Sequence, residues 1–186
     1  MVKRLIEKNL FGQPVPQQRP RYEAALGHVD KRQNAARAAR MRWLREVTPK
    51  NIGYILPVET ALAFEEARSC FIYGNFIATV LLAAAFVEHW LVSNLESRGH
   101  SSEASRGLAA AIKFARAKNL VDHAILDRAD HLRLIRNPFV HLKEFGHEYT
   151  VSQRASKDRT DPWTLIEGDA KEALIAMYGI AKYASG

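Results

Sequence analysis

The sequence contains a single cysteine, Cys70, in 186 residues, which excludes a disulfide within the chain and a cysteine-rich zinc site. It also lacks a glycine-rich phosphate loop, an HExxH metal motif and a GxSxG nucleophile motif. The most apolar run, residues 76–87, is shorter than the roughly 20 residues that a bilayer-spanning helix needs. We therefore expect a cytoplasmic protein with no membrane segment, in which residues 76–87 belong to a buried core helix.

The side chains that usually hold metal ions are scattered along the chain. His123 and His131 lie on one predicted helix, but Asp127 between them is more typical of a charged outer face than of a metal site. Cys70 lies on the apolar side of another predicted helix, where cysteine is usually a small buried residue. We predict neither a metal site nor a cofactor.

The positive charge is concentrated in the first quarter of the chain. Residues 1–50 hold 12 basic and 4 acidic residues, a net charge of +8, whereas residues 51–186 hold 15 and 16, a net charge of −1. Such a segment indicates an anionic partner, most simply nucleic acid, because Lys and Arg side chains that neutralise phosphates release counterions. A solvated helix face explains the same charge without any partner. The expected nucleic-acid contacts are the clustered arginines Arg37, Arg40, Arg42 and Arg45.

The spacing of apolar residues predicts a chain made almost entirely of helices. Three prolines between residues 14 and 20 favour an extended N-terminal arm. Residues 148–151 are β-prone but isolated. The sequence thus predicts an all-α bundle of about five to six helices with a proline-rich arm, divided into a basic extension at 1–50 and a bundle at 51–186. The expected helices cover residues 21–47, 58–73, 76–96, about 101–115, about 120–137 and about 169–183, the last capped by Asp169.

The most informative stretch lies at the end of the helix expected near residues 120–137. It contains Arg136, Asn137 and, five residues after the arginine, His141. Metal-free cleavage of RNA needs a group that moves protons at the 2′-hydroxyl and the leaving oxygen, and a cation that stabilises charge on phosphorus. A histidine, whose unperturbed pKa is about 6.5, suits the first task. The planar guanidinium of an arginine suits the second task, because its N–H donors match phosphate oxygens and its charge is permanent. Asn137 can orient the phosphate or the imidazole.

Pro138 lies between the arginine and the histidine. On an undistorted helix the side chains of Arg136 and His141 point about 140° apart, which does not favour action on the same group. A proline ring clashes with the carbonyl four residues earlier, so we expect a kink or restart that permits both side chains to face one cleft. The same residues also fit a purely structural role, in which His141 caps a helix, Arg136 pairs with a carboxylate and Asn137 ends the turn.

This arrangement resembles the HEPN domain (higher eukaryotes and prokaryotes nucleotide-binding), a family of helical bundles marked by an arginine, four to six residues and a histidine. Residues 136–141, with the sequence RNPFVH, match the version with asparagine after the arginine. The upstream order is similar as well, with the stretch 65–74, the apolar helix around 86–91 and two further helices leading into the motif. The resemblance covers residues 58–183. The family pattern does not require Pro138, and Lys143 stands where one subgroup has a tyrosine.

The resemblance implies a metal-independent endoribonuclease that forms a homodimer, in which two motifs build one composite site. Carried onto this chain, Arg136 and His141 would be catalytic and Asn137 would assist. The implied partners are RNA, a second copy and, for a toxin or defence effector, an antitoxin or regulatory protein. Glu88 is a further candidate, because a charge among apolar neighbours must find a partner if it is buried. It fits equally well as a partly exposed residue at the edge of its helix.

Two other functions fit the same sequence. A HEPN-type bundle without catalysis would dimerise or bind RNA or protein. A regulator would bind DNA or RNA mainly through residues 19–47. Cleavage of RNA separates the first hypothesis from both, because function depends on the site and not on the bundle.

Overall fold

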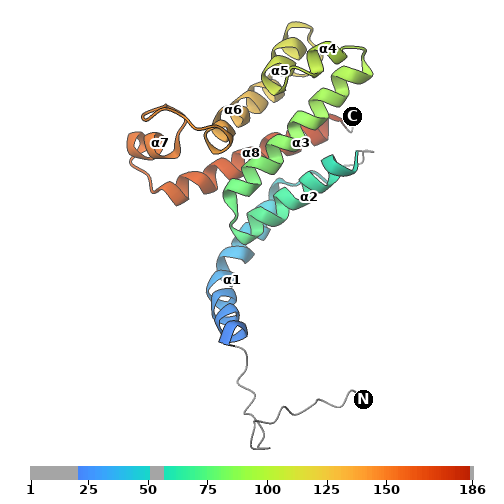
Figure 1. Cartoon of the computed structure of the whole chain (residues 1–186). Coiled ribbons are helices and arrows are strands. Elements are labelled where there is room, and N and C mark those ends of the chain that lie inside the picture. The colour runs from blue at the N-terminus through green and yellow to red at the C-terminus, as the bar shows by residue number, and fades with distance from the viewer. Residues whose placement is uncertain (1–20, 51–56, 185–186) are drawn as a thin grey trace, which may run out of the picture. The chain divides into compact units, whose positions relative to one another are not determined.

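A computed structural model describes residues 21–50 and 57–184, and all regular structure in these ranges is helical (Figure 1). The all-α class is confirmed, and the described ranges hold eight helices where about five to six were expected. The proline-rich arm falls in residues 1–20, outside the described residues. In chain order the helices are α1 (Arg21–Val47), α2 (Val58–Tyr73), α3 (Phe76–Ser97), α4 (Ser101–Ala104), α5 (Leu108–Ala117), α6 (His123–Val140), α7 (Val151–Asp158) and α8 (Pro162–Ala184).

The chain divides into two compact units, Met1–Ala38 and Ala39–Gly186. The described part of the first unit is the beginning of α1, where no side chain is buried. Within it, Arg37 Nη1 lies 3.0 Å from Asp30 Oδ1, and Arg37 Nη2 donates a hydrogen bond of 3.0 Å to Gln33 Oε1. This stretch of helix is therefore tied together by polar contacts along its own surface.

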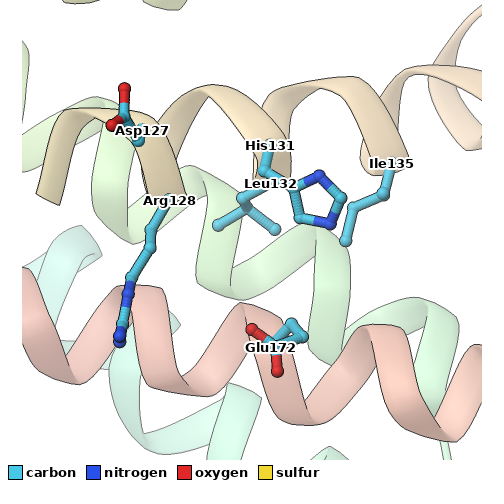
Figure 2. Close-up of a pocket in the computed structure, with 6 residues that line it drawn as sticks. All are labelled: Asp127, Arg128, His131, Leu132, Ile135 and Glu172. Carbon is cyan, nitrogen blue, oxygen red and sulfur yellow. The ribbon is translucent and has the colours of Figure 1, made fainter. Parts of the chain in front are cut away.

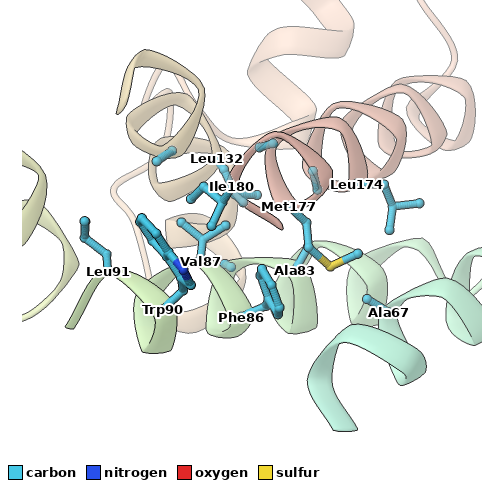
Figure 3. Close-up of a cluster of buried hydrophobic side chains, with 14 of the residues drawn as sticks. Ala67, Ala83, Phe86, Val87, Trp90, Leu91, Leu132, Leu174, Met177 and Ile180 are labelled. Carbon is cyan, nitrogen blue, oxygen red and sulfur yellow. The ribbon is translucent and has the colours of Figure 1, made fainter. Parts of the chain in front are cut away.

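The core of the second unit is built around α3, which packs against α2, α8, α4, α5 and α6 (Figure 1). Its side chains Phe86, Val87 and Leu91 are fully buried. Figure 3 shows Phe86 and Val87 in one apolar cluster with Met177 of α8. By length and composition alone α3 could span a membrane, but 50% of its most apolar window is buried within the bundle. Ten of the 22 residues of α3 are buried, so the expected core position of this helix is confirmed.

The end of α1, residues 39–47, contributes to this core. Leu44 is only 5% exposed and belongs to the same apolar cluster as α3. Just after the helix, the Thr48 hydroxyl lies 3.2 Å from the phenol oxygen of Tyr178 on α8. Burial of this phenol raises the pKa of Tyr178 above its ordinary value. The last turns of α1 are thus held by apolar packing and by a polar contact with α8.

The expectation of one helix over about 101–115 is wrong, because two helices, α4 and α5, cover this stretch. Gly107 separates them with a φ of 86°. A positive φ is the left-handed region that a glycine adopts without steric cost, and it cannot continue a right-handed helix. The break lets Leu108 begin α5 with its backbone N–H directed at a side chain of α3, as described below.

The C-terminal third also differs from expectation. The β-prone residues 148–151 form no strand, and Val151 instead begins α7, with the Thr150 hydroxyl accepting a hydrogen bond from the Gln153 N–H at 3.4 Å. The last helix begins at Pro162 and not near residue 169. Its cap is Asp161, whose Oδ2 accepts the Thr164 N–H at 3.0 Å. Both starts follow the rule that a short oxygen-bearing side chain satisfies the first free backbone donors of a helix.

Asp169 therefore does not cap the last helix, as the sequence suggested, but lies inside α8 with only 6% exposure. Both of its carboxylate oxygens accept hydrogen bonds from Arg154 of α7, one of them at 2.8 Å from Nη1. This two-point pairing raises the pKa of Arg154. A buried carboxylate needs such a partner, so the pair fixes α7 against α8.

Candidate active site

The candidate site is built around an ion pair between α3 and α6. Arg136 Nη2 lies 3.1 Å from Glu88 Oε2, and the two side chains are 19% and 30% exposed. Glu88 lies in the half of α3 that also carries the buried Val87 and Trp90. In this position a lone carboxylate would be costly, and the guanidinium compensates it.

Glu88 binds a second group on the other side of its carboxylate. Its Oε1 accepts a hydrogen bond of 3.2 Å from the backbone N–H of Leu108, the first residue of α5. The N-terminus of a helix carries a partial positive charge and free N–H groups, so it favours a carboxylate there. Glu88 thereby joins three helices and holds Arg136 in a defined place. The structure brings these two predicted site residues together.

His141 lies at the other end of the motif and in a different environment. It ends α6 in an extended conformation, with a φ of −131° and a ψ of 128°, and its side chain is exposed. Its backbone N–H donates to the Asn137 carbonyl at 2.9 Å. Within the described part of the chain, its imidazole makes no hydrogen bond or ion pair. The ring is therefore accessible to an incoming group.

Pro138 does not interrupt α6, which continues to Val140, so the expected restart of the helix at the proline is wrong. Arg136 keeps its half-buried place against α3, while His141 leaves the helix on the solvent side. No hydrogen bond joins their side chains within the described residues. Asn137 is half-buried between them. A single copy of the chain thus pairs Arg136 with Glu88 but leaves His141 separate.

The four arginines expected to contact nucleic acid fall into two groups. Arg37 and Arg40 are already engaged. Arg37 binds Asp30 as described above, and Arg40 Nε donates to the Ile72 carbonyl at 2.9 Å at the end of α2. The guanidinium of Arg40 also lies 5.5 Å from the ring centroid of Phe76.

Arg42 and Arg45 form the second group. Both side chains are exposed, and neither makes a hydrogen bond or ion pair within the described ranges. They lie three residues apart on α1, a spacing that puts both on one face of a helix. Among the four candidates, these two have their guanidinium groups open to solvent for a phosphate.

Sequence reasoning missed a pocket between α6 and α8, with a volume of about 210 Å³ (Figure 2). His131, considered above for a metal, instead lines this pocket, and among the described residues no cluster of His, Cys, Asp and Glu can hold a metal ion. The spacing of its α6 residues at 128, 131, 132 and 135 is the signal that was available. The pocket is lined by Asp127, Arg128, His131, Leu132, Ile135 and Glu172.

Comparisons of the chain with protein-family models, with curated proteins and with solved structures found no match. The resemblance to the HEPN family therefore depends on residues 136–141 and on the order of the helices around them.

Proposed function

We propose that the chain is a HEPN-like endoribonuclease that works without a metal ion, as a homodimer. One observation carries the proposal. Glu88 holds Arg136 through Nη2 alone, and within the described part of the chain Nη1 makes no hydrogen bond. An arginine fixed on one side and open on the other is prepared to bind a phosphate oxygen without losing further side-chain freedom.

The residues of the motif then have distinct roles. His141 moves the proton of the 2′-hydroxyl or gives one to the leaving 5′-oxygen, because imidazole exchanges protons near neutral pH. Arg136 stabilises the extra negative charge that develops on the phosphate oxygens during attack. Asn137, which follows Arg136 directly in the chain, orients the phosphate or the imidazole. Glu88 acts through Arg136 as a positioning residue.

A second copy of the chain supplies what one copy lacks. Arg136 and His141 are separated in the monomer, so a composite site needs a histidine from the partner subunit. The surface around His141 suits an interface, because Val140, Leu142 and Phe145 are 47%, 102% and 108% exposed. Adjoining apolar side chains that remain in water favour association.

RNA is held in part by the exposed guanidinium groups of Arg42 and Arg45, which attract phosphates over a longer range. We place the protein in the cytoplasm, where RNA is present and a single cysteine stays reduced. Uncontrolled RNA cleavage harms a cell, so a toxin or defence effector of this kind requires an antitoxin or another regulatory protein.

A second function is favoured by one observation, the unbroken course of α6 through Pro138. If the two motifs never converge on one phosphate, the same bundle is a non-catalytic module that dimerises and binds RNA or a protein. The ion pair of Arg136 and Glu88 is then a purely structural contact between α3 and α6.

The deciding experiment is cleavage of RNA by the purified full chain in the presence of EDTA. The proposal expects products with 2′,3′-cyclic phosphate ends and a dimer by light scattering. Loss of cleavage in both Arg136→Ala and His141→Ala supports it. A stable dimer that binds RNA but leaves it intact supports the non-catalytic module, and activity that survives both substitutions overturns the proposal.

A further inference from the structure

The loop between α6 and α7 carries a phenylalanine that the rest of the chain does not cover. Phe145 is 108% exposed, and within the described part of the chain its ring contacts no other ring and no cation. An apolar ring gains free energy when it leaves water, and short polar residues or glycine are the usual choice for a loop. Packing within the chain therefore does not explain a phenylalanine at this position.

The backbone holds this side chain at the tip of a closed turn. The His147 N–H donates to the Glu144 carbonyl at 3.1 Å, so Phe145 and Gly146 are the two central residues of a four-residue turn. Gly146 has a φ of 86°, whereas the φ of Phe145 is not positive. This combination defines a type II turn, whose third position needs the left-handed conformation that glycine adopts without steric cost.

A second turn follows directly and ties the loop to α7. The His147 carbonyl accepts hydrogen bonds from the Thr150 N–H at 3.0 Å and from the Thr150 hydroxyl at 2.8 Å. Thr150 is also the residue that caps α7. The backbone around Phe145 is thus ordered before any partner binds, so a contact with the ring costs little further loop entropy.

The tip of the turn presents one ring and not an apolar patch. The neighbours of Phe145 in the turn, Glu144 and Gly146, are exposed and add no apolar side chain. The core of a protein interface is built from several clustered apolar side chains, whereas a nucleobase needs only one aromatic face on which to stack. Lys143 and Glu144 carry opposite charges, so this part of the loop attracts phosphate only weakly.

The turn lies close to the candidate catalytic histidine. Four residues of fully extended chain span at most about 14 Å, which limits the distance between the Cα atoms of His141 and Phe145. About four stacked nucleotides, at about 3.4 Å each, cover the same distance. We propose that the Phe145 ring stacks on an unpaired base of the RNA within about four nucleotides of the bond that is cut, which rests on the proposed ribonuclease function.

Phe145 also belongs to the apolar surface that is proposed above as a subunit interface. A composite active site forms at that interface, so side chains of this surface border the bound RNA as well. The two roles require different chemistry, because an aliphatic side chain fills an interface but offers no aromatic face to a base.

The test is RNA binding by the full chain, with His141→Ala in every variant so that the RNA stays intact. The probes are a short single-stranded RNA and a set of otherwise identical RNAs that each lack one base. We expect Phe145→Leu to lower the affinity at least about fivefold, the lower limit for one base–aromatic stack, and Phe145→Tyr to keep it. The slope of log affinity against log salt stays the same in both variants, because stacking neutralises no phosphate.

The RNAs that lack a base identify the contact. Removal of one particular base weakens binding when residue 145 is Phe or Tyr, and it has no effect in Phe145→Leu. Light scattering gives the same mass for all three chains. Since Phe145 is fully exposed, both substitutions keep the fold.

Unchanged affinity in Phe145→Leu, an equal loss in Phe145→Tyr, or loss of the dimer in Phe145→Leu overturns the proposal. Every chain in this test lacks His141, so the outcome does not depend on cleavage. Coupling between the ring and one base, in a chain whose original sequence cleaves no RNA, supports the role of Phe145 and contradicts the ribonuclease. Cleavage without such coupling supports the ribonuclease and contradicts the role of Phe145, and absence of RNA binding overturns both.

Discussion

Arg136 on α6 and Glu88 on α3 are 48 positions apart in the sequence and 3.1 Å apart in the structure, between Nη2 and Oε2. The second oxygen of Glu88 binds the first backbone N–H of α5 at Leu108. The candidate catalytic arginine is thus positioned by a carboxylate that is itself fixed by a helix N-terminus. Disturbing Glu88 should therefore affect both the packing of three helices and the chemistry of Arg136.

Glu88→Gln tests this relationship while keeping the size of the side chain. We expect the free energy of unfolding to fall by about 1–2 kcal/mol, because the substitution weakens the partly exposed contact with Arg136 but does not remove it. RNA cleavage should fall at least about tenfold, mainly in kcat, since Arg136 acts on the transition state. Urea denaturation and single-turnover cleavage measure the two effects.

The matched control for this variant is Glu65→Gln, which removes the more exposed ion pair with Arg68. An exposed pair of this kind contributes up to about 1 kcal/mol, and its loss should leave cleavage unchanged. Cleavage by Glu88→Gln at the rate of the original chain would contradict the positioning role, even if its stability falls.

His141→Ala separates catalysis from folding, because the histidine is exposed and only its backbone N–H is used. We expect cleavage to fall by about 10²–10⁴-fold, the usual contribution of a general acid or base. The unfolding midpoint should not change. His123→Ala, at an exposed histidine that contacts Asn119 at 3.0 Å, is the control and should keep full activity. Equal losses in the two variants would remove His141 from the mechanism.

The parts of the fold that the sequence predicts best are the long helices with strong apolar periodicity. The range expected for α2 is correct, and the range expected for α3 is one residue short. α7 and the start of α8 were missed although both carry local signals, Thr150 with Gln153 and Asp161 with Pro162. Those first turns are mostly exposed, so the apolar pattern that guided the prediction is weak there.

For the candidate site, prediction from the sequence fails for a different reason. Arg136, Asn137 and His141 lie within six consecutive residues and were predicted together, but the contact of Arg136 with Glu88 depends on the packing of α3 against α6. No local pattern encodes that packing. For the same reason the sequence cannot separate Arg40, whose partner Ile72 lies on α2, from Arg42, which faces solvent two positions later.

Asp169→Asn should be the most destabilising of these substitutions. The change leaves Arg154 without its charge partner, and breaking a buried pair of this kind costs about 3–5 kcal/mol. The two side chains are 8% and 16% exposed, so solvent compensates little. Urea denaturation measures the loss. Glu167→Gln, which removes the more exposed pair with Lys171 on the same helix, should cost at most about 1 kcal/mol. Equal costs would show that burial does not decide the strength of the pair.

Tyr178 makes the stability of the bundle sensitive to alkaline pH. Burial raises its pKa above the ordinary value of 10.0, so the unfolded chain releases this proton at a lower pH than the folded chain. The contribution is complete below that ordinary value and is lost as pH rises through the higher folded pKa. Urea midpoints between about pH 9 and about pH 11 should fall more steeply for the original chain than for Tyr178→Phe. Parallel curves would contradict this assignment.

Arg42 and Arg45 provide the last test, which concerns RNA affinity and not cleavage. Replacing both by glutamine should weaken RNA binding and reduce the slope of log affinity against log salt by about 1.4, since each single-strand phosphate contact contributes about 0.7. Stability should not change, because both side chains are exposed. Arg40→Gln should behave in the opposite way, because Arg40 binds the Ile72 carbonyl and contacts the ring of Phe76. It should lower the urea midpoint and leave the salt slope unchanged. If the double variant keeps the slope, the exposed arginines of α1 do not contact phosphate, and the RNA must be bound by another surface.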